Sequence, residues 1–200
     1  MIDRQTCLDY LRRDRRAVLR AVDGVPEYDA RRPLTRSGTN LLGVVKHLAL
    51  VELEYVSECA GFPCDLGTPW KDADEAINAD LWLTADESAE SVIALYVAAG
   101  AHTERAAAAL PIDSPATVPW WSKGDTTFDR LLVHLVSETA QHAGHLDILR
   151  EGLDGQGDRW DESRAERDEA WWTALLSRIA AAAEPFRGSD STVAAPEGTF

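Results

Sequence analysis

Residues able to bind a metal ion are concentrated between positions 134 and 145. Four polar side chains follow one another there at helical spacing: His134, Glu138, His142 and His145. At about 100° per residue, the last three fall within an arc of roughly 60° on a helix, and His134 lies roughly 20° further round. Leucine and valine residues flank this face, so burying it is costly unless a ligand or hydrogen bonds satisfy the polar groups. A carboxylate and an imidazole at i and i+4 can direct ligand atoms to one divalent cation.

A second helix must complete such a site, and His47 is the best candidate. Its neighbours are valine and leucine, which predicts that the imidazole points into a helical bundle. The residues alone leave two alternatives open. His47 could be a hydrogen-bonded core histidine, and Glu138 with His142 could be an ordinary surface pair. The fifth histidine, His102, lies in an alanine-rich polar stretch and is expected to be solvated.

Five stretches have the periodicity of amphipathic helices, and no stretch is typical of a strand. They cover about residues 3–23, 39–60, 84–110, 128–152 and 161–184. Thr39 or Ser37 is expected to cap the second stretch and Thr126 or Thr127 the fourth, while Thr84 and Glu87 form a capping box at the third. The pattern predicts an all-α bundle over residues 1–184, followed by a flexible tail over residues 185–200.

Composition limits the classes of partner. The chain has 200 residues and a formal net charge of −14, which argues against binding to nucleic acid or to an anionic membrane. It contains no apolar stretch of the roughly 20 residues that a membrane span needs. Three cysteines without a CxxC pair argue against a disulfide framework. We therefore expect a cytoplasmic protein.

The same motifs resemble the DinB superfamily (DinB/YfiT-like bundles), and within it the actinobacterial mycothiol-dependent branch of transferases and maleylpyruvate isomerases. The resemblance runs from about residue 5 to 180. It is carried by residues 37–49, residues 118–121 (Val-Pro-Trp-Trp) and residues 132–155, which contain the His and Glu stripe. It implies an up-down-down-up four-helix bundle with an additional C-terminal helix, and a homodimer as one expected assembly.

The resemblance also implies a three-residue site for a divalent metal, zinc or nickel in most relatives. His47 matches the ligand from the second helix, and Glu138 and His142 match the pair from the later helix. Glutamate at position 138 favours the thiol-using branch. His145 is a candidate fourth or substitute ligand. The i, i+4 spacing to His142 favours Glu138 over His145 as the third ligand but leaves both open.

The activity implied is that of a metal-dependent thiol S-transferase or thiol-dependent isomerase. Mycothiol is the expected cosubstrate, and its thiolate would attack an electrophilic small molecule. Trp120, Trp121, His134 and Arg150 are the candidate substrate-binding residues, although the tryptophans could equally anchor a loop and Arg150 could be a solvated cation. Two alternatives stay open: a non-catalytic metal-binding stress-response or small-ligand-binding protein, and an interaction module whose polar stripe is a hydrogen-bonded network.

Overall fold

The chain divides into two compact units, Met1–Asp158 and Arg159–Phe200. The computed structural model describes residues 3–67, 78–156 and 167–187. We expected one domain over residues 1–184. The helix α7 (Glu169–Ala183) instead belongs to the second unit. Most of the tail expected at residues 185–200 lies outside the described residues.

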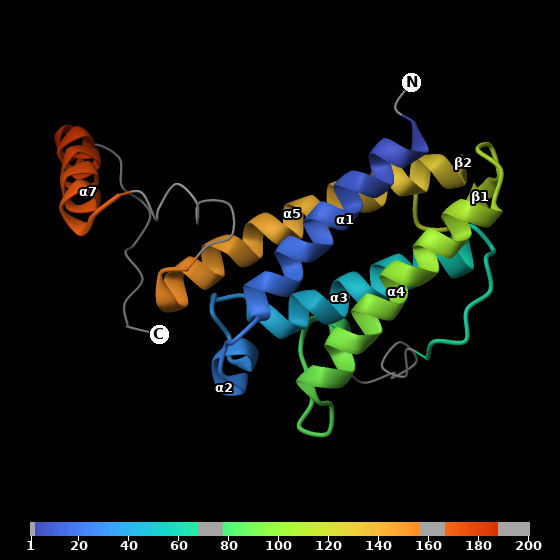
Figure 1. Cartoon of the computed structure of the whole chain (residues 1–200), viewed down its shortest axis with the longest axis horizontal. Coiled ribbons are helices and arrows are strands. Elements are labelled where there is room, and N and C mark those ends of the chain that lie inside the picture. The colour runs from blue at the N-terminus through green and yellow to red at the C-terminus, as the bar shows by residue number, and fades with distance from the viewer. Residues whose placement is uncertain (1–2, 68–77, 157–166, 188–200) are drawn as a thin grey trace. The chain divides into compact units, whose positions relative to one another are not determined.

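Four long helices build the first unit (Figure 1). They are α1 (Arg4–Val22), α3 (Leu41–Leu53), α4 (Ala89–Ala109) and α5 (Phe128–Asp154). The shorter elements are α2 (Glu27–Arg31), the π-helix η1 (Glu54–Cys59), the 3-10 helix η2 (Ala79–Leu81), and the strands β1 (Pro115–Thr117) and β2 (Asp125–Thr127). The residues of the first unit that the structure describes thus form an all-α bundle apart from the short strand pair, as predicted.

Contacts at their ends show that α1 and α5 run parallel. At their beginnings, Arg4 Nε donates to Asp129 Oδ1 over 2.8 Å. At their ends, Arg150 Nη1 donates to the Ala21 carbonyl oxygen over 3.0 Å. Arg150 therefore stabilises the C-terminal end of α1, whose last carbonyl groups have no partner within the helix.

The helices α3 and α4 form the other parallel pair. Lys46 pairs with Glu87 just before α4, and further along Thr103 Oγ1 donates to Glu52 Oε2. Figure 1 shows that this pair runs opposite to α1 and α5, which gives the up-down-down-up order.

Local structure departs from the expectations at three helix starts. Asn40, not Thr39 or Ser37, caps α3, because its Oδ1 accepts from the Gly43 amide over 2.8 Å. Ser88, not Thr84, caps α4. The Thr84 amide still donates to the Glu87 carboxylate, but this hydrogen bond stabilises a turn that precedes the helix. The short α2 also forms inside a predicted loop, where acidic residues in its first turn favour a helix N-terminus.

One more difference is a small antiparallel hairpin between α4 and α5. The strands β1 and β2 pair Pro115 with Thr127 and Thr117 with Asp125. Three residues per strand are too few for a strand pattern to be visible in the sequence. The hairpin holds the loop that carries the two tryptophans of the Val-Pro-Trp-Trp motif.

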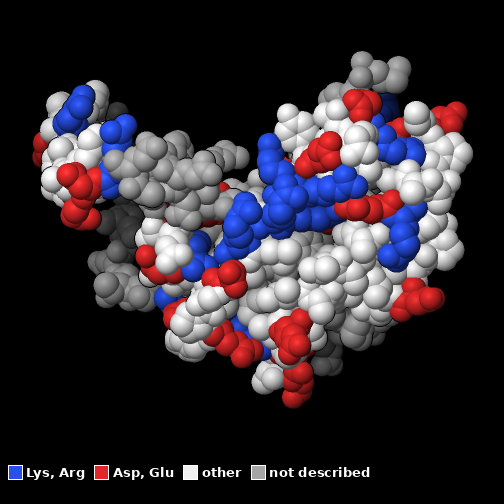
Figure 2. All heavy atoms as spheres, viewed as in Figure 1, with Lys and Arg blue, Asp and Glu red and all other residues white. Residues whose placement is uncertain are grey.

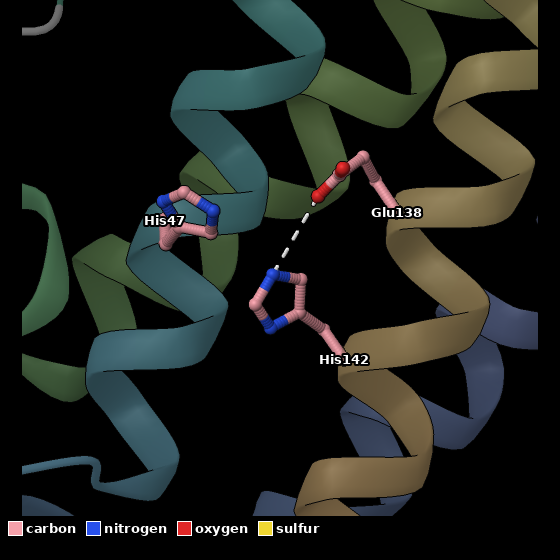
Figure 3. Close-up of side chains that lie close together, drawn as sticks. All are labelled: His47, Glu138 and His142. Atoms are coloured by element: carbon pink, nitrogen blue, oxygen red, sulfur yellow. Dashed lines mark ion pairs between the residues drawn. The ribbon is translucent and has the colours of Figure 1, made fainter.

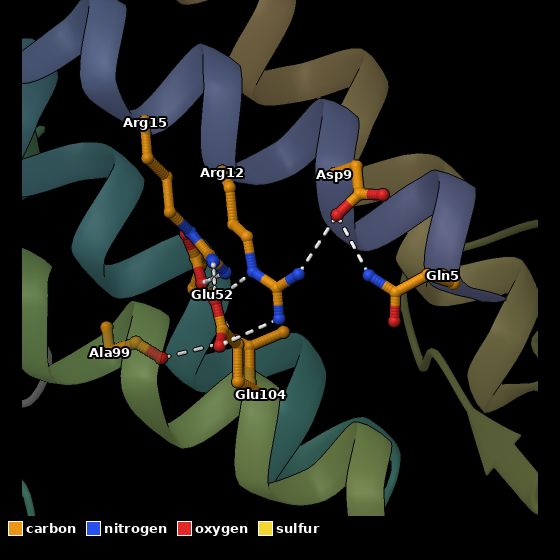
Figure 4. Close-up of polar contacts among 8 residues, drawn as sticks. Gln5, Asp9, Arg12, Arg15, Glu52, Ala99 and Glu104 are labelled. Atoms are coloured by element: carbon orange, nitrogen blue, oxygen red, sulfur yellow. Dashed lines mark hydrogen bonds and ion pairs between the residues drawn. The ribbon is translucent and has the colours of Figure 1, made fainter.

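The packing of α3 is dominated by leucine and valine, but it includes a buried ion pair (Figure 4). Arg15 Nε donates to Glu52 Oε1 over 2.7 Å, and both side chains are almost fully enclosed. Burial disfavours the charged guanidinium, but the carboxylate of Glu52 outweighs this and raises the pKa of Arg15. The pair links α1 to the C-terminal end of α3.

Several other arginines of α1 are solvated. Figure 2 shows Lys and Arg side chains gathered on this side of the molecule. Arg13, Arg16 and Arg20 are exposed, and Arg12 pairs with Glu104. Arg15, on the same helix, is instead buried.

The second unit is described by the helix α7 (Glu169–Ala183) and a short 3-10 turn, Glu184–Phe186. Asp168 caps α7 by accepting from the Trp171 amide over 2.8 Å. In the described ranges, no residue of α7 is buried and no helix of the chain is long and apolar enough to cross a membrane.

Candidate metal centre

The helices α3 and α5 bring together three residues that the sequence analysis had singled out (Figure 3). Each of His47, Glu138 and His142 offers one ligand atom, and these atoms all lie within 4.8 Å of one another. We call these residues the triad. On α5, the fully buried Leu135 and Leu146 lie on either side of Glu138 and His142, so core packing fixes the helix face that carries them.

His47 is oriented by a carboxylate from outside the long helices. Its Nδ1 lies 2.6 Å from Oδ2 of Asp80, in η2. Because an ionised carboxylate only accepts hydrogen bonds, Nδ1 donates in this contact, which leaves Nε2 as the ring nitrogen available to a metal ion. The ring centroids of His47 and His142 are 5.0 Å apart, which places the two imidazoles against each other.

His142 is also prepared to act as a neutral ligand. Burial, and after it the neighbouring His47, lowers the pKa of His142, so the neutral imidazole is favoured at pH 7. Its Nε2 lies 3.7 Å from Oε2 of Glu138. Its Nδ1 is buried and has no hydrogen-bond partner among the described residues. A buried polar atom without a partner is unusual and is consistent with a missing ligand or water.

These residues fit a divalent cation. Two imidazoles and one carboxylate match the ligand sets of catalytic zinc sites, which leave one position open. Ligand atoms that bind one ion at about 2.0–2.2 Å lie closer to one another than the 4.8 Å limit that the triad's atoms satisfy. Small side-chain rotations would close that difference. Nitrogen and carboxylate donors suit zinc, nickel, iron and manganese alike, so the set does not select one metal.

An aromatic wall, formed by Tyr55, Trp120, Trp121 and His134, lies next to the triad. His134 Nε2 is 3.8 Å from Glu138 Oε1, and its ring packs against Tyr55 and Trp121 at centroid distances of 4.6 and 5.1 Å. Trp120 Nε1 donates to the Tyr55 hydroxyl over 3.2 Å. Burial lowers the pKa of His134. The structure therefore brings three of the four candidate substrate-binding residues to one side of Glu138.

Two other candidates lie differently. His145 is exposed and, although its ring is 5.3 Å from that of His142, it is not one of the three residues whose ligand atoms converge. Arg150 is buried, and its guanidinium donates to the carbonyl oxygens of Ala21 and Asp23 and to Asp154. Through these contacts Arg150 stabilises the C-terminal end of α1. None of them brings its guanidinium toward the triad.

Sequence reasoning missed two neighbours of the site and misjudged one histidine. Asp80 lies in a stretch without periodicity, so no signal pointed to it. Tyr55 lies among apolar residues of its helix, and nothing in the sequence indicated that its hydroxyl accepts a hydrogen bond from Trp120. His102 was expected to be solvated but is 1% exposed, with Nε2 3.2 Å from the Ser57 hydroxyl and its ring against Phe62. The alanines around it form a close helix contact, which is why the stretch is buried.

Comparisons with known proteins identify the family and a similar fold. Residues 6–155 match the mycothiol-S-transferase family. Among solved structures, a conserved protein from Enterococcus faecalis is similar, with 14% identity, a TM-score of 0.60, and coverage of 78% of this chain and 99% of that one. At that identity the likeness shows the fold alone. No curated protein matches. Because the family match spans most of the chain, the chain belongs to the mycothiol-S-transferase family, a DinB-like family.

Proposed function

We propose that this protein is a divalent-metal-dependent mycothiol S-transferase, with His47, Glu138 and His142 as the metal ligands. One observation carries the proposal: an imidazole from α3 and an imidazole and carboxylate from α5 converge within 4.8 Å. The family match supports the thiol. Zinc and nickel are the metals we expect, and Glu138 rather than His145 is the third ligand on this geometry.

The chemistry needs a thiolate at neutral pH and an electrophile beside it. A bound divalent cation would lower the pKa of a coordinating thiol and so supply the thiolate. In the transfer, a bond forms between the thiol sulfur and an electrophilic carbon, the bond from that carbon to its leaving group breaks, and the thiol proton is released.

The protein's own residues would bind the reactants and keep water out. Trp120 is 54% exposed, yet its indole is fixed by the Tyr55 hydroxyl, so it offers a rigid apolar surface to an incoming molecule. His134 stays neutral at pH 7 because burial lowers its pKa, and it faces Glu138. We propose that it forms part of the substrate site and can accept the released proton.

The test is thiol transfer by the metal-loaded protein. Zinc- or nickel-loaded protein is mixed with mycothiol and monochlorobimane, and formation of the fluorescent conjugate is followed. We expect turnover that is lost on chelation and in His47→Ala. His145→Ala is the matched control, because this exposed histidine lies beside the triad but outside it. We expect it to keep its activity.

Two outcomes would contradict the proposal. A protein that binds metal but is inert toward mycothiol and other thiols would be a non-catalytic metal-binding bundle. A folded protein that binds no divalent metal would leave the triad as a hydrogen-bonded network, and the metal-dependent mechanism would be wrong.

A further inference from the structure

We infer that Asp80 is a positioning residue for the metal site, and that the segment 78–82 is docked on α3 so that this carboxylate fixes the tautomer and direction of His47. The inference rests on the proposed function, in which His47 binds the metal. It concerns a segment that precedes α4 and supplies none of the three converging ligand atoms.

The first step is the contact between the two side chains. His47 Nδ1 and Asp80 Oδ2 are 2.6 Å apart, and the side chains are 23% and 24% exposed. A carboxylate here accepts a hydrogen bond from Nδ1–H, so Nε2 is the ring nitrogen left to bind a metal ion. Carboxylates that accept from the other nitrogen of a metal-binding histidine commonly set ring orientation and raise ligand basicity.

The second step is the close fit of the backbone around Asp80 against α3. A Cβ atom at Gly43 would lie 1.9 Å from the Leu81 carbonyl oxygen, so only glycine permits this approach. Asn40 Nδ2 donates to the same carbonyl oxygen over 3.2 Å. The segment therefore touches α3 where the helix has no side chain in the way.

The third step is a buried lysine that holds the far end of the segment. Lys46 is 1% exposed, and its Nζ donates to the Trp82 carbonyl oxygen over 2.9 Å. The same ammonium pairs with Glu87 at 2.7 Å. Burial by itself would raise the pKa of Glu87, but the contacts with Lys46 help to outweigh it, and the pKa is lowered. A buried cation without such partners would be costly, so this arrangement favours one docked position.

These contacts come from one side of α3. Positions 40, 43, 46 and 47 recur at helical spacing. The first two meet the Leu81 carbonyl group, Lys46 meets that of Trp82, and His47 meets the Asp80 carboxylate. The backbone that follows Asp80 is thus held against α3 at Leu81 and Trp82, by contacts separate from the one between the carboxylate and His47. A carboxylate fixed in this way is suited to orient a metal ligand rather than to pair transiently with it.

The test compares Asp80→Ala and Asp80→Asn with the unmodified protein, in two measurements. The first is zinc affinity, determined by competition with a chromophoric chelator. Loss of such a carboxylate typically weakens metal binding about 10–100-fold, and we expect that loss in Asp80→Ala. We expect a smaller loss in Asp80→Asn, since its amide oxygen can still accept from Nδ1–H.

The second measurement needs no metal. Long-range ¹H–¹⁵N spectra of the metal-free protein near pH 8 report which ring nitrogen of His47 is protonated, with His47→Gln identifying the signals. We expect Nδ1–H in the unmodified protein and in Asp80→Asn, and a shift toward Nε2–H in Asp80→Ala. Asp29→Asn, which changes a carboxylate paired with Arg32, is the control and should alter neither measurement.

The outcomes separate this inference from the proposed function. Nε2–H on His47 in the unmodified protein, or zinc affinity within twofold of the unmodified protein in a folded Asp80→Ala, would overturn the positioning role. Either result would leave thiol transfer intact. Failure of thiol transfer with the expected tautomer and affinity changes would overturn the proposed activity and leave the role of Asp80 standing.

Discussion

The buried pair of Arg15 and Glu52 holds the helix that carries His47, and its removal gives a quantitative prediction. Glu52 accepts from Arg15 and from the Thr103 hydroxyl, so it joins α1, α3 and α4. Glu52→Leu leaves the guanidinium buried without its carboxylate, which typically costs about 3–5 kcal/mol. For a chain of this size that corresponds to a fall in Tm of roughly 6–20 °C.

The assay is urea and thermal unfolding followed by circular dichroism in the absence of metal. The double variant Arg15→Met/Glu52→Leu removes both charges, and we expect it to recover much of the lost stability. Glu27→Gln, in a pair whose carboxylate side chain is 59% exposed, is the control and should change the free energy of unfolding by less than about 1 kcal/mol. If Glu52→Leu is no less stable than this control, the reasoning is wrong.

Three further predictions concern other parts of the fold. Arg150→Met should destabilise the protein by about 2–4 kcal/mol, because two carbonyl groups at the end of α1 lose a charged donor. Zinc affinity should not change, and a large loss of affinity would instead favour a place for Arg150 in the site. Gly43→Ala should lower Tm and weaken zinc binding together, since the new Cβ would displace the Leu81 carbonyl group; unchanged affinity would contradict the docking of residues 78–82. Burial lowers the pKa of His102 from its ordinary value of 6.5, so the unfolded chain takes up the proton first and stability should fall as the pH drops below about 6.5. His102→Asn should flatten that fall in metal-free urea titrations, and an unchanged slope would count against it.

The sequence predicted the face of α5 correctly because helical periodicity is a local property. Glu138 and His142 lie one turn apart wherever the helix packs, and the leucines beside them determine which side faces inward. The apolar neighbours of His47 made it the best candidate for a second helix, but they left a hydrogen-bonded core histidine as an alternative, and the family resemblance favoured the metal site. Local pattern contains no information about which two helices meet.

The features that the sequence did not reveal also depend on tertiary contacts. Arg15 looks like the other arginines of α1 in sequence, and only the position of Glu52 explains its burial. His102 looked solvated because alanines permit a close helix contact as readily as exposure. Asp80 could not be found because its role depends on backbone docking at Gly43, a tertiary feature without a periodic signal.

The most direct test of the central claim is the stoichiometry of metal binding to the triad. Zinc and nickel are titrated into metal-free protein and into His47→Ala, Glu138→Gln, His142→Ala and His145→Ala, with bound metal measured after dialysis. Three converging ligands predict one ion per chain, lost or greatly weakened in the first three variants and kept in His145→Ala. A folded protein that holds no ion, or one that loses its ion only in His145→Ala, would contradict the account.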